Sequence, residues 1–217
     1  MQKRIKKYYQ RESKIIFPSV SEIALHVKNK NLRSRKNSWP DYLFFPSASR
    51  KVKLINYYLV VSRLVKYKKV DLAIEAFNEL NLPLVIVGTG REEKKLKNLA
   101  NKNVIFLGNI DDGKLSDVYK NAKALIFPQD EDFGIVAVEA QSFGVPVIAY
   151  KKGGAIDTVI QNKTGIFFDE QNTTSLIKAI RKFEKTKFNK KTIVKNAKRF
   201  SKERFEREFL QVVKSLC

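Results

Sequence analysis

Two glutamates, Glu131 and Glu139, flank a short turn whose residue types suit ligand binding. The apolar run 124–127 comes just before the turn and predicts a buried strand, and the apolar residues after Gly134 predict a helix. This order places a helix N-terminus and two carboxylates at the carboxyl end of a strand, where α/β sheets bind ligands. The free backbone N–H groups of such a helix N-terminus favour anionic groups such as phosphate.

The members of this turn predict different contacts with a ligand. Gly134 has no side chain, so backbone N–H groups around it can approach a phosphate closely. Glu139 lies about one turn into the helix, where its carboxylate could accept hydrogen bonds from two vicinal hydroxyls, as on a ribose. Glu131 could instead reach a sugar hydroxyl. A purely structural role is open for both, with Glu131 as an exposed loop acid and Glu139 as a buried acid paired with a nearby lysine.

The loop 62–69 is a second candidate, because it brings positive charge to the end of another predicted strand. Ser62 and Arg63 open it, and Lys68 lies among three lysines near its end. An arginine can bind a diphosphate through two hydrogen bonds, and a lysine acts as a mobile point charge. An ordinary solvated run of charges explains the same residues, so this loop alone does not decide the function.

Glycines follow three further predicted strands. The pair Gly88 and Gly90 matches part of a dinucleotide fingerprint, but the third glycine is absent, which favours a tight turn beside a ligand or a neighbouring loop. Gly108 ends another apolar run. Gly153 and Gly154 fit either a concave ligand surface or a plain turn between a strand and a helix.

Short apolar runs alternate with helical patterns from residue 56 onward. Strands are predicted at 57–61, 84–87, 104–107, 124–127, 145–149 and 165–168. Apolar strands that alternate with amphipathic helices indicate a parallel sheet covered on both faces. We therefore predict an α/β fold, a doubly wound Rossmann-like parallel sheet of about six strands with C-terminal helices.

Composition divides the chain into three parts. Residues 1–55 form a basic N-terminal arm, in which 14–18 predict a short strand ended by proline. Residues 56–185 form the α/β domain, with a short helix at 158–160 and a later helix capped by Asn172 or Thr173. Residues 186–217 form a helical extension, whose final basic amphipathic helix carries Phe200, Phe205, Phe209 and Val212.

The net charge and the rare residues bound the possible functions. The 217 residues carry 43 Lys and Arg against 22 Asp and Glu, a formal net charge of +21. This excess favours an anionic partner, namely nucleic acid, an acidic membrane or a phosphate-bearing substrate, although a merely solubilising lysine surface explains it equally well. The sequence has no apolar run of membrane-spanning length, no secretory pattern and one cysteine, Cys217, which together predict a cytoplasmic protein. The lone His26 predicts no metal site.

Seven short motifs agree in order and spacing with one protein family. They are Ser-Arg-Leu-Val-x-x-Lys (62–68), Val-Ile-Val-Gly-x-Gly (85–90), Val-x-Phe-Leu-Gly (104–108), Glu-x-Phe-Gly-x-x-x-x-Glu-Ala (131–140), Gly-Val-Pro-Val-Ile-Ala (144–149), Gly-Gly-x-x-Asp (153–157) and Thr-Gly-Ile-Phe-Phe (164–168). Over roughly residues 56–185 the sequence resembles the C-terminal domain of GT-B-fold retaining glycosyltransferases of the family 4, or glycosyl transferase group 1, type. Lys69 stands where this family often has glycine, and Asp157 where it often has glutamate.

The resemblance implies a site for a nucleotide sugar, GDP- or UDP-linked, and transfer of a hexosyl group with retention to a saccharide or lipid-linked acceptor. It implies neither a metal nor a cofactor. By this resemblance Arg63 and Lys68 hold the diphosphate, Glu131 contacts the donor sugar and Glu139 the ribose. The remaining residues implied to bind the donor or its nucleotide are Ser62, Gly88, Gly108, Asp132, Phe133, Gly134 and Ile135.

Such enzymes carry out the reaction between two Rossmann-like domains, of which the acceptor-side domain comes first. The resemblance therefore implies that activity needs an N-terminal acceptor domain, either missing from this chain or supplied by a partner chain. The alternative is a non-catalytic basic module that binds nucleic acid or an anionic membrane. A combination of the two is a peripheral enzyme at the inner face of the membrane, and nucleic acid is the least favoured partner.

Overall fold

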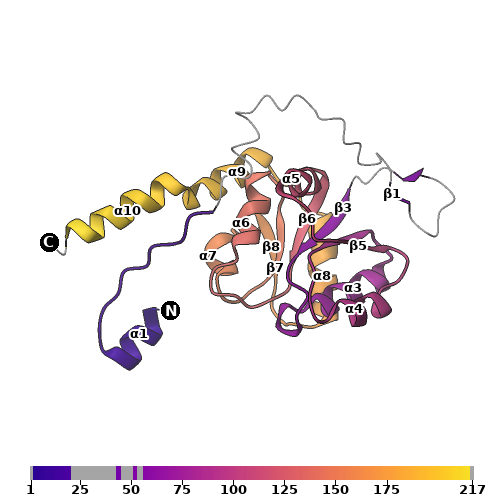
Figure 1. Cartoon of the computed structure of the whole chain (residues 1–217), viewed down its shortest axis with the longest axis horizontal. Coiled ribbons are helices and arrows are strands. Elements are labelled where there is room, and N and C mark those ends of the chain that lie inside the picture. The colour runs from indigo at the N-terminus through magenta and orange to yellow at the C-terminus, as the bar shows by residue number, and fades with distance from the viewer. Residues whose placement is uncertain (1, 21–42, 45–50, 53–55, 216–217) are drawn as a thin grey trace.

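The computed structural model describes residues 2–20, 43–44, 51–52 and 56–215, and its centre is a sheet of six parallel strands. The strand order is β5-β4-β3-β6-β7-β8 (Figure 1). The strands are β3 (Tyr57–Val61), β4 (Leu84–Val87), β5 (Val104–Gly108), β6 (Ala122–Phe127), β7 (Val147–Tyr150) and β8 (Gly165–Phe168). A separate antiparallel pair joins β1 (Leu43–Phe44) to β2 (Lys51–Val52).

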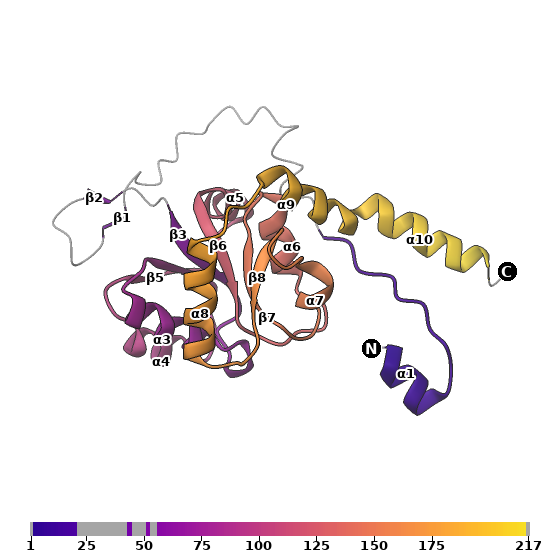
Figure 2. The same ribbon diagram turned by 180° about the vertical axis from the view of Figure 1, so that it is seen from behind.

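Helices cover both faces of the sheet, as the nearly all-apolar strands require. Alternate strand residues contribute to two buried clusters, so that Tyr58 faces one side and Leu59 the other. The helices α3 (Val70–Leu80), α4 (Glu93–Leu99) and α8 (Thr173–Glu184) pack on the first side. The helices α5 (Asp112–Asn121), α6 (Ile135–Ser142) and α7 (Ala155–Thr158) cover the second (Figures 1 and 2).

The strand order places a topological switch point between β3 and β6. From β3 the chain runs outward to β4 and β5, and it then returns to β6 on the other side of β3. The two strands lie side by side, with Leu59 next to Leu125. In open α/β sheets the crevice at the carboxyl ends of such strands binds ligands. The predicted fold is therefore confirmed, and so is the placement of both candidate loops at one edge of the sheet.

The C-terminal segment contains more helices than the sequence indicated. Between α8 and the final helix lie α9 (Lys190–Ala197), capped by the Asn189 side chain, and the short 3-10 helix η2 (Lys198–Phe200). Helix α9 packs against α6, and Ile193, Ala197 and Phe200 are buried. Of the helices that follow β8, α10 (Lys202–Lys214) is the one that extends away from the sheet, and at the other end of the chain α1 (Gln2–Tyr9) also lies apart from it (Figure 1). None of the helices in the described ranges combines the length and apolar character needed to cross a membrane.

Three local predictions need correction. Residues 14–18 form no strand, and the Phe17 ring instead packs against two other phenylalanines, Phe133 and Phe200. The short helix predicted at 158–160 lies earlier, as α7. Phe200 does not belong to the last helix, because Ser201 caps a new helix by accepting a hydrogen bond from the Arg204 backbone N–H. The cap of α8 is Asn172, one of the two predicted residues. Most of the predicted N-terminal arm after residue 20 lies outside the described residues.

Candidate functional site

The basic loop after β3 is held against the loop after β4 by backbone hydrogen bonds. Ser62 N–H donates to the Val87 carbonyl (3.0 Å) and Leu64 N–H to the Thr89 carbonyl (2.9 Å), while Leu64 accepts from Glu92 N–H (3.0 Å). Leu64 is fully buried and anchors the loop in the core. The loop therefore presents Arg63 from a fixed backbone.

Gly88 and Gly90 make this contact possible. A Cβ at Gly88 would overlap the Ser62 carbonyl oxygen, and a Cβ at Gly90 would overlap that of Leu64. Gly88 also has a φ of +121°, a conformation that side chains disfavour. The Gly-x-Gly pair thus serves the approach of a neighbouring loop, which is one of the two roles predicted for it.

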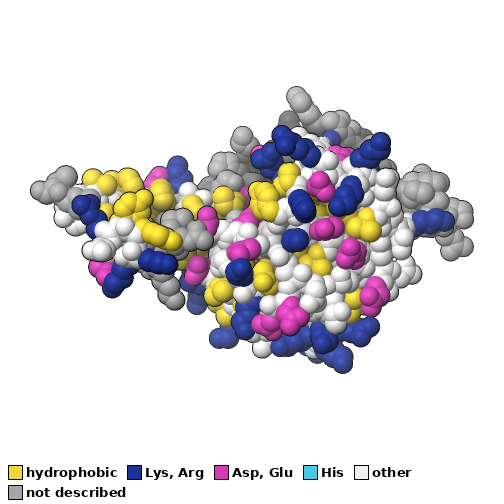
Figure 3. Space-filling model, turned by 90° about the horizontal axis from the view of Figure 1, so that it is seen from below, with side chains coloured by type: hydrophobic (Ala, Val, Ile, Leu, Met, Phe, Trp, Pro, Cys, Tyr) yellow, Lys and Arg dark blue, Asp and Glu magenta, His cyan; other side chains and the backbone are white. Residues whose placement is uncertain are grey.

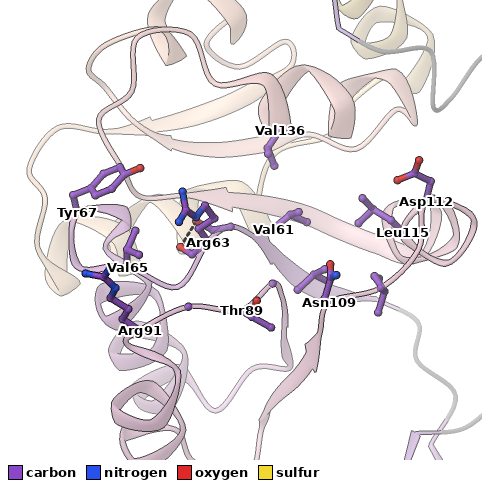
Figure 4. A pocket seen from close by; sticks show the side chains of 15 residues that line it. Val61, Arg63, Val65, Tyr67, Thr89, Arg91, Asn109, Asp112, Leu115 and Val136 are labelled. Carbon is purple, nitrogen blue, oxygen red and sulfur yellow. Dashed lines mark hydrogen bonds between the residues drawn. The ribbon is translucent and has the colours of Figure 1, made fainter.

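A pocket of about 810 Å³ opens over these two loops (Figure 4). Arg63 points into its centre, Arg91 and Tyr67 lie at one end, and Asn109 and Asp112 lie at the other. The complete lining is Val61, Ser62, Arg63, Val65, Tyr67, Val87, Gly88, Thr89, Gly90, Arg91, Asn109, Ile110, Asp112, Leu115 and Val136. The pocket has the size expected for a small-molecule ligand, and two guanidinium groups give it anion-binding capacity.

A second hollow of about 560 Å³ adjoins the first, because Tyr67 and Val136 line both. It is formed by the loop 130–134 and the first turn of α6. Gly134 caps that helix with φ +82°, and a Cβ there would approach the Phe127 ring to 2.8 Å. A residue with a side chain would therefore both strain the turn and push it off the sheet, which explains the glycine.

The acidic loop is also fixed from the side of α7. Gly154 N–H donates to the Glu131 carbonyl (2.6 Å), and a Cβ on Gly154 would overlap the Phe133 backbone. A Cβ on Gly153 would overlap the Glu131 carbonyl oxygen. The glycine pair thus holds the acidic loop in place, which connects the third and fourth predicted motifs.

An ion pair between Lys68 and Glu131 joins the basic loop to the acidic loop. Lys68 lies in the 3-10 helix η1 (Lys66–Lys68), next to Lys69, whose φ of +54° explains why a glycine suits that position. Burial and the nearby Arg63 guanidinium lower the pKa of the Lys68 ammonium, whereas the Glu131 carboxylate favours its charged form. Because Arg63 adds a second cation, this part of the site can accept further negative charge.

Glu139 has a different environment. It is half-buried on α6 and accepts a hydrogen bond from the Tyr119 hydroxyl (3.0 Å). Burial raises the pKa of the Glu139 carboxyl, and the charge of Asp112 raises it further, although the Tyr119 hydrogen bond acts in the opposite direction. Among the described residues, the hydrogen-bond partner of Glu139 is therefore a tyrosine and not the lysine of the structural alternative.

The family assignment rests on a match to the family of glycosyl transferases group 1, whose model covers residues 45–200. This chain belongs to that family. It is 30% identical over 153 residues to an uncharacterized glycosyltransferase of Methanocaldococcus jannaschii, a match that covers 68% of this chain and 44% of the relative. It is 28% identical over 162 residues to the capsular polysaccharide biosynthesis glycosyltransferase CapM of Staphylococcus aureus, covering 69% and 42%. The chain thus spans less than half the length of these curated relatives.

Solved structures of glycosyltransferases share the fold of this group 1 domain. Sucrose-phosphate synthase of Thermosynechococcus elongatus superposes with a TM-score of 0.72 at 19% identity, covering 99% of this chain and 56% of that one. Anabaena HepE, solved in complex with UDP and glucose, gives a TM-score of 0.61 at 24% identity, covering 74% and 48%. The predicted membership in the GT-B group 1 glycosyltransferases is confirmed.

Some of the predicted site residues line the two hollows of this group 1 domain, and others lie beside them. Ser62, Arg63 and Gly88 line the larger hollow; Glu131, Asp132, Phe133, Gly134 and Ile135 line the smaller. Lys68, Gly108 and Glu139 line neither, although each has a neighbour in the sequence or in space that does: Tyr67, Asn109 and Asp112 respectively.

Sequence reasoning did not select five polar or aromatic residues that line the larger pocket, Tyr67, Thr89, Arg91, Asn109 and Asp112. A usable signal existed for Arg91, because a cation directly follows the Gly-x-Gly turn at the end of a strand. Asp112 begins α5 and lies at the opposite end of the pocket from Arg91, so only the fold brings the two to one pocket (Figure 4).

Proposed function

We propose that this group 1 domain binds the nucleotide-sugar donor of a retaining hexosyltransferase of the family 4 type. The observation that carries the proposal is that two hollows adjoin each other, one lined by two arginines and the other by an acidic loop. Arg63 and Arg91 line the larger hollow, and Glu131 lines the smaller, where the N-terminus of α6 opens. A nucleoside diphosphate sugar has this same order of groups, with two negative phosphates between a nucleoside and a neutral sugar.

In this proposal Arg63 and Lys68 bind the diphosphate, assisted by Ser62 and the backbone N–H groups around Gly134. Charge develops on the diphosphate as the bond to the sugar breaks, and fixed cations stabilise that charge without a metal or a cofactor. Glu131 accepts hydrogen bonds from donor-sugar hydroxyls, and Glu139 from the ribose. The loops after Gly88 and Gly108 border the base, which is guanine or uracil.

We further propose that turnover needs an acceptor-binding N-terminal domain, present in cis or on a partner chain, and that the acceptor is a saccharide or is lipid-linked. The match covers less than half of each of two curated relatives, which supports this proposal. A relative in Corynebacterium glutamicum, 38% identical over 114 residues, is named a GDP-mannose-dependent mannosyltransferase acting on a phosphatidylinositol monomannoside. That name supports testing GDP-mannose and a glycolipid acceptor first.

Isothermal titration of the chain with GDP, UDP and their hexose conjugates tests the donor site. Arg63→Ala should weaken the Kd of the preferred nucleotide about 10- to 100-fold, the usual range for losing charge-assisted hydrogen bonds. Arg181→Ala is the matched control, because Arg181 is exposed on α8 outside both hollows. The proposal fails if no nucleotide binds, or if the two variants have the same affinity as the unaltered chain.

A second candidate function is contact with an anionic membrane at the cytoplasmic face. From Lys185 to Lys202 the chain has eight lysines and arginines and no acidic residue. In the sheet domain, by contrast, lysines and acids are interspersed on the face shown in Figure 3. The ion pairs of that domain include Lys97 with Glu93 (2.7 Å). The pairing of Lys202 with Glu206 (3.6 Å) on α10 is the one ion pair of this basic stretch in the part of the chain that the structure describes.

Sedimentation with vesicles tests this second function. Vesicles that contain phosphatidylserine should retain the chain at low salt and release it as salt rises, because exposed charges are screened. The triple variant Lys190→Glu, Lys191→Glu and Lys195→Glu should abolish retention while nucleotide affinity is unchanged. Equal retention by neutral phosphatidylcholine vesicles would count against a membrane partner. Release of the chain from the anionic vesicles by added single-stranded nucleic acid would also count against it.

A further inference from the structure

Three phenylalanines from distant parts of the chain meet beside the acidic loop. The ring of Phe17 stacks on Phe133, with centroids 5.8 Å apart, and meets Phe200 edge-on at 5.7 Å. The rings of Phe133 and Phe200 are 5.4 Å apart. Val20 and Val138 are buried in the same cluster. The segment before the sheet is thus packed against a residue of the smaller hollow.

Specific hydrogen bonds fix the N-terminal segment in this position. The Arg204 guanidinium donates to the Phe17 carbonyl (2.7 Å) and pairs with Glu208 (2.7 Å), and it is mostly shielded from solvent. Val20 N–H donates to the Phe200 carbonyl (3.0 Å). Lone aromatic contacts on a surface need no explanation, but a guanidinium aimed at one backbone carbonyl indicates a defined docking position.

Phe133 is the point where this cluster reaches the proposed donor site. Its backbone packs against Gly154, and its ring packs against Phe17 and Phe200. Its neighbours Asp132 and Gly134 line the smaller hollow with it. The sheet domain therefore holds one side of the acidic loop, while Phe17 of the N-terminal segment and Phe200 of η2 hold the other.

We propose that Phe17 is a positioning residue, which acts through Phe133 to hold the acidic loop and the start of α6 in their ligand-binding geometry. The effect on donor binding rests on the proposed function, whereas the effect on the loop itself does not. Docking of residues 17–20 and binding of the donor are then coupled, so each stabilises the other. Any displacement of the N-terminal segment is transmitted to the donor end of the site.

Hydrogen exchange of the ligand-free chain tests the positioning directly. Phe17→Ala should speed exchange of the backbone amides from Asp132 to Ala137, and Phe17→Leu, which keeps apolar contact, should speed it less. Ile15→Ala is the matched control, because Ile15 lies in the same segment with 43% of its surface exposed. Unchanged exchange in Phe17→Ala at residues 132–137, with the chain folded by circular dichroism, would overturn the proposal.

A double-mutant cycle on donor binding separates positioning from general destabilisation. Phe17→Ala should weaken the Kd of the nucleotide sugar that the unaltered chain prefers by about 2- to 10-fold, the range for an aromatic pair. In a Phe133→Leu background the same substitution should have little further effect. Full additivity would overturn the route through Phe133. If the unaltered chain binds no donor, the proposed function fails, and the exchange experiment still decides the role of Phe17.

Discussion

The two glutamates of the acidic turn lie within nine residues of each other but have opposite electrostatic environments. Glu131, in the loop, contacts the Lys68 ammonium, so its charge is compensated before any ligand arrives. Glu139, on α6, accepts a hydrogen bond from the neutral Tyr119 hydroxyl, and burial raises the pKa of its carboxyl. The loop is thus stabilised by a charge interaction across the site, whereas the helix carries a carboxylate that costs stability when it is ionised.

The largest expected effect comes from disrupting the backbone support of the Glu131 loop. Gly154→Ala should lower the free energy of unfolding by about 1 to 3 kcal/mol, the usual cost of overpacking, because its Cβ would overlap the Phe133 backbone. Chemical denaturation measures this loss. Gly113→Ala in α5 is the control and should be neutral or slightly stabilising, since its Cβ meets only the Asp111 carboxylate oxygen at 3.2 Å. Equal effects of the two variants would show that the loop is not held through Gly154.

A smaller effect is expected from separating the ion pair. Lys68→Met should lower the free energy of unfolding at neutral pH by about 1 kcal/mol, because it leaves the Glu131 carboxylate without its partner. Adding Glu131→Gln should recover most of this loss, and Lys66→Met is the matched control on the exposed side of η1. Additive losses in the double variant would mean that the pair contributes no coupling energy.

A substitution that removes the charge of Glu139 is expected to raise stability, in contrast to the losses predicted above. Its folded-state pKa is raised above the ordinary value of 4.5, so the chain gains relative stability when Glu139 is protonated and loses it as pH rises through the folded pKa. By chemical denaturation, Glu139→Gln should therefore raise the free energy of unfolding at neutral pH by less than Lys68→Met lowers it. The gain should vanish below the ordinary pKa. A destabilised Glu139→Gln at neutral pH would show that ionised Glu139 is stabilised by contacts in the folded chain.

The smallest expected effect concerns Lys69, a left-handed residue that directly follows Lys68, the partner of Glu131. Lys69→Gly should raise the free energy of unfolding by about 0.5 kcal/mol, since relief of left-handed strain exceeds the entropy cost of an added glycine. Asn81→Gly is the control and should gain less, because asparagine tolerates this conformation better than lysine. A loss of stability in Lys69→Gly would indicate that the lysine side chain contributes contacts that outweigh the strain.

Sequence reasoning was most successful where one residue pattern has one physical solution. Apolar runs such as 84–87 and 124–127 can be buried on both faces only in a covered parallel sheet, and they form β4 and part of β6. Asn172 and the glycines at 88 and 134 likewise carry local requirements that a sequence displays. These patterns were sufficient to predict the fold and the edge of the sheet where the site lies.

Partnerships between distant residues could not be predicted in this way. Nothing local to Glu139 distinguishes a lysine partner from Tyr119, which lies 20 residues earlier on another helix. Phe17 belongs to a stretch whose β-forming residues predict a strand, and its packing on Phe133 and Phe200 depends on helices more than 100 residues away. Ser201 could have revealed the break before α10, because a serine before a charged helical run is a common cap.

In the Gly-Thr-Gly-Arg turn (88–91), the contact between the loops after β3 and β4 gives alternate residues different roles. The backbone of the neighbouring loop fills the space that side chains at positions 88 and 90 would need, so only glycine fits there. Thr89 and Arg91 alternate with them and line the pocket (Figure 4). A library confined to 89 and 91 would therefore vary the pocket wall on an unaltered scaffold, which makes this turn a practical place to redesign ligand preference.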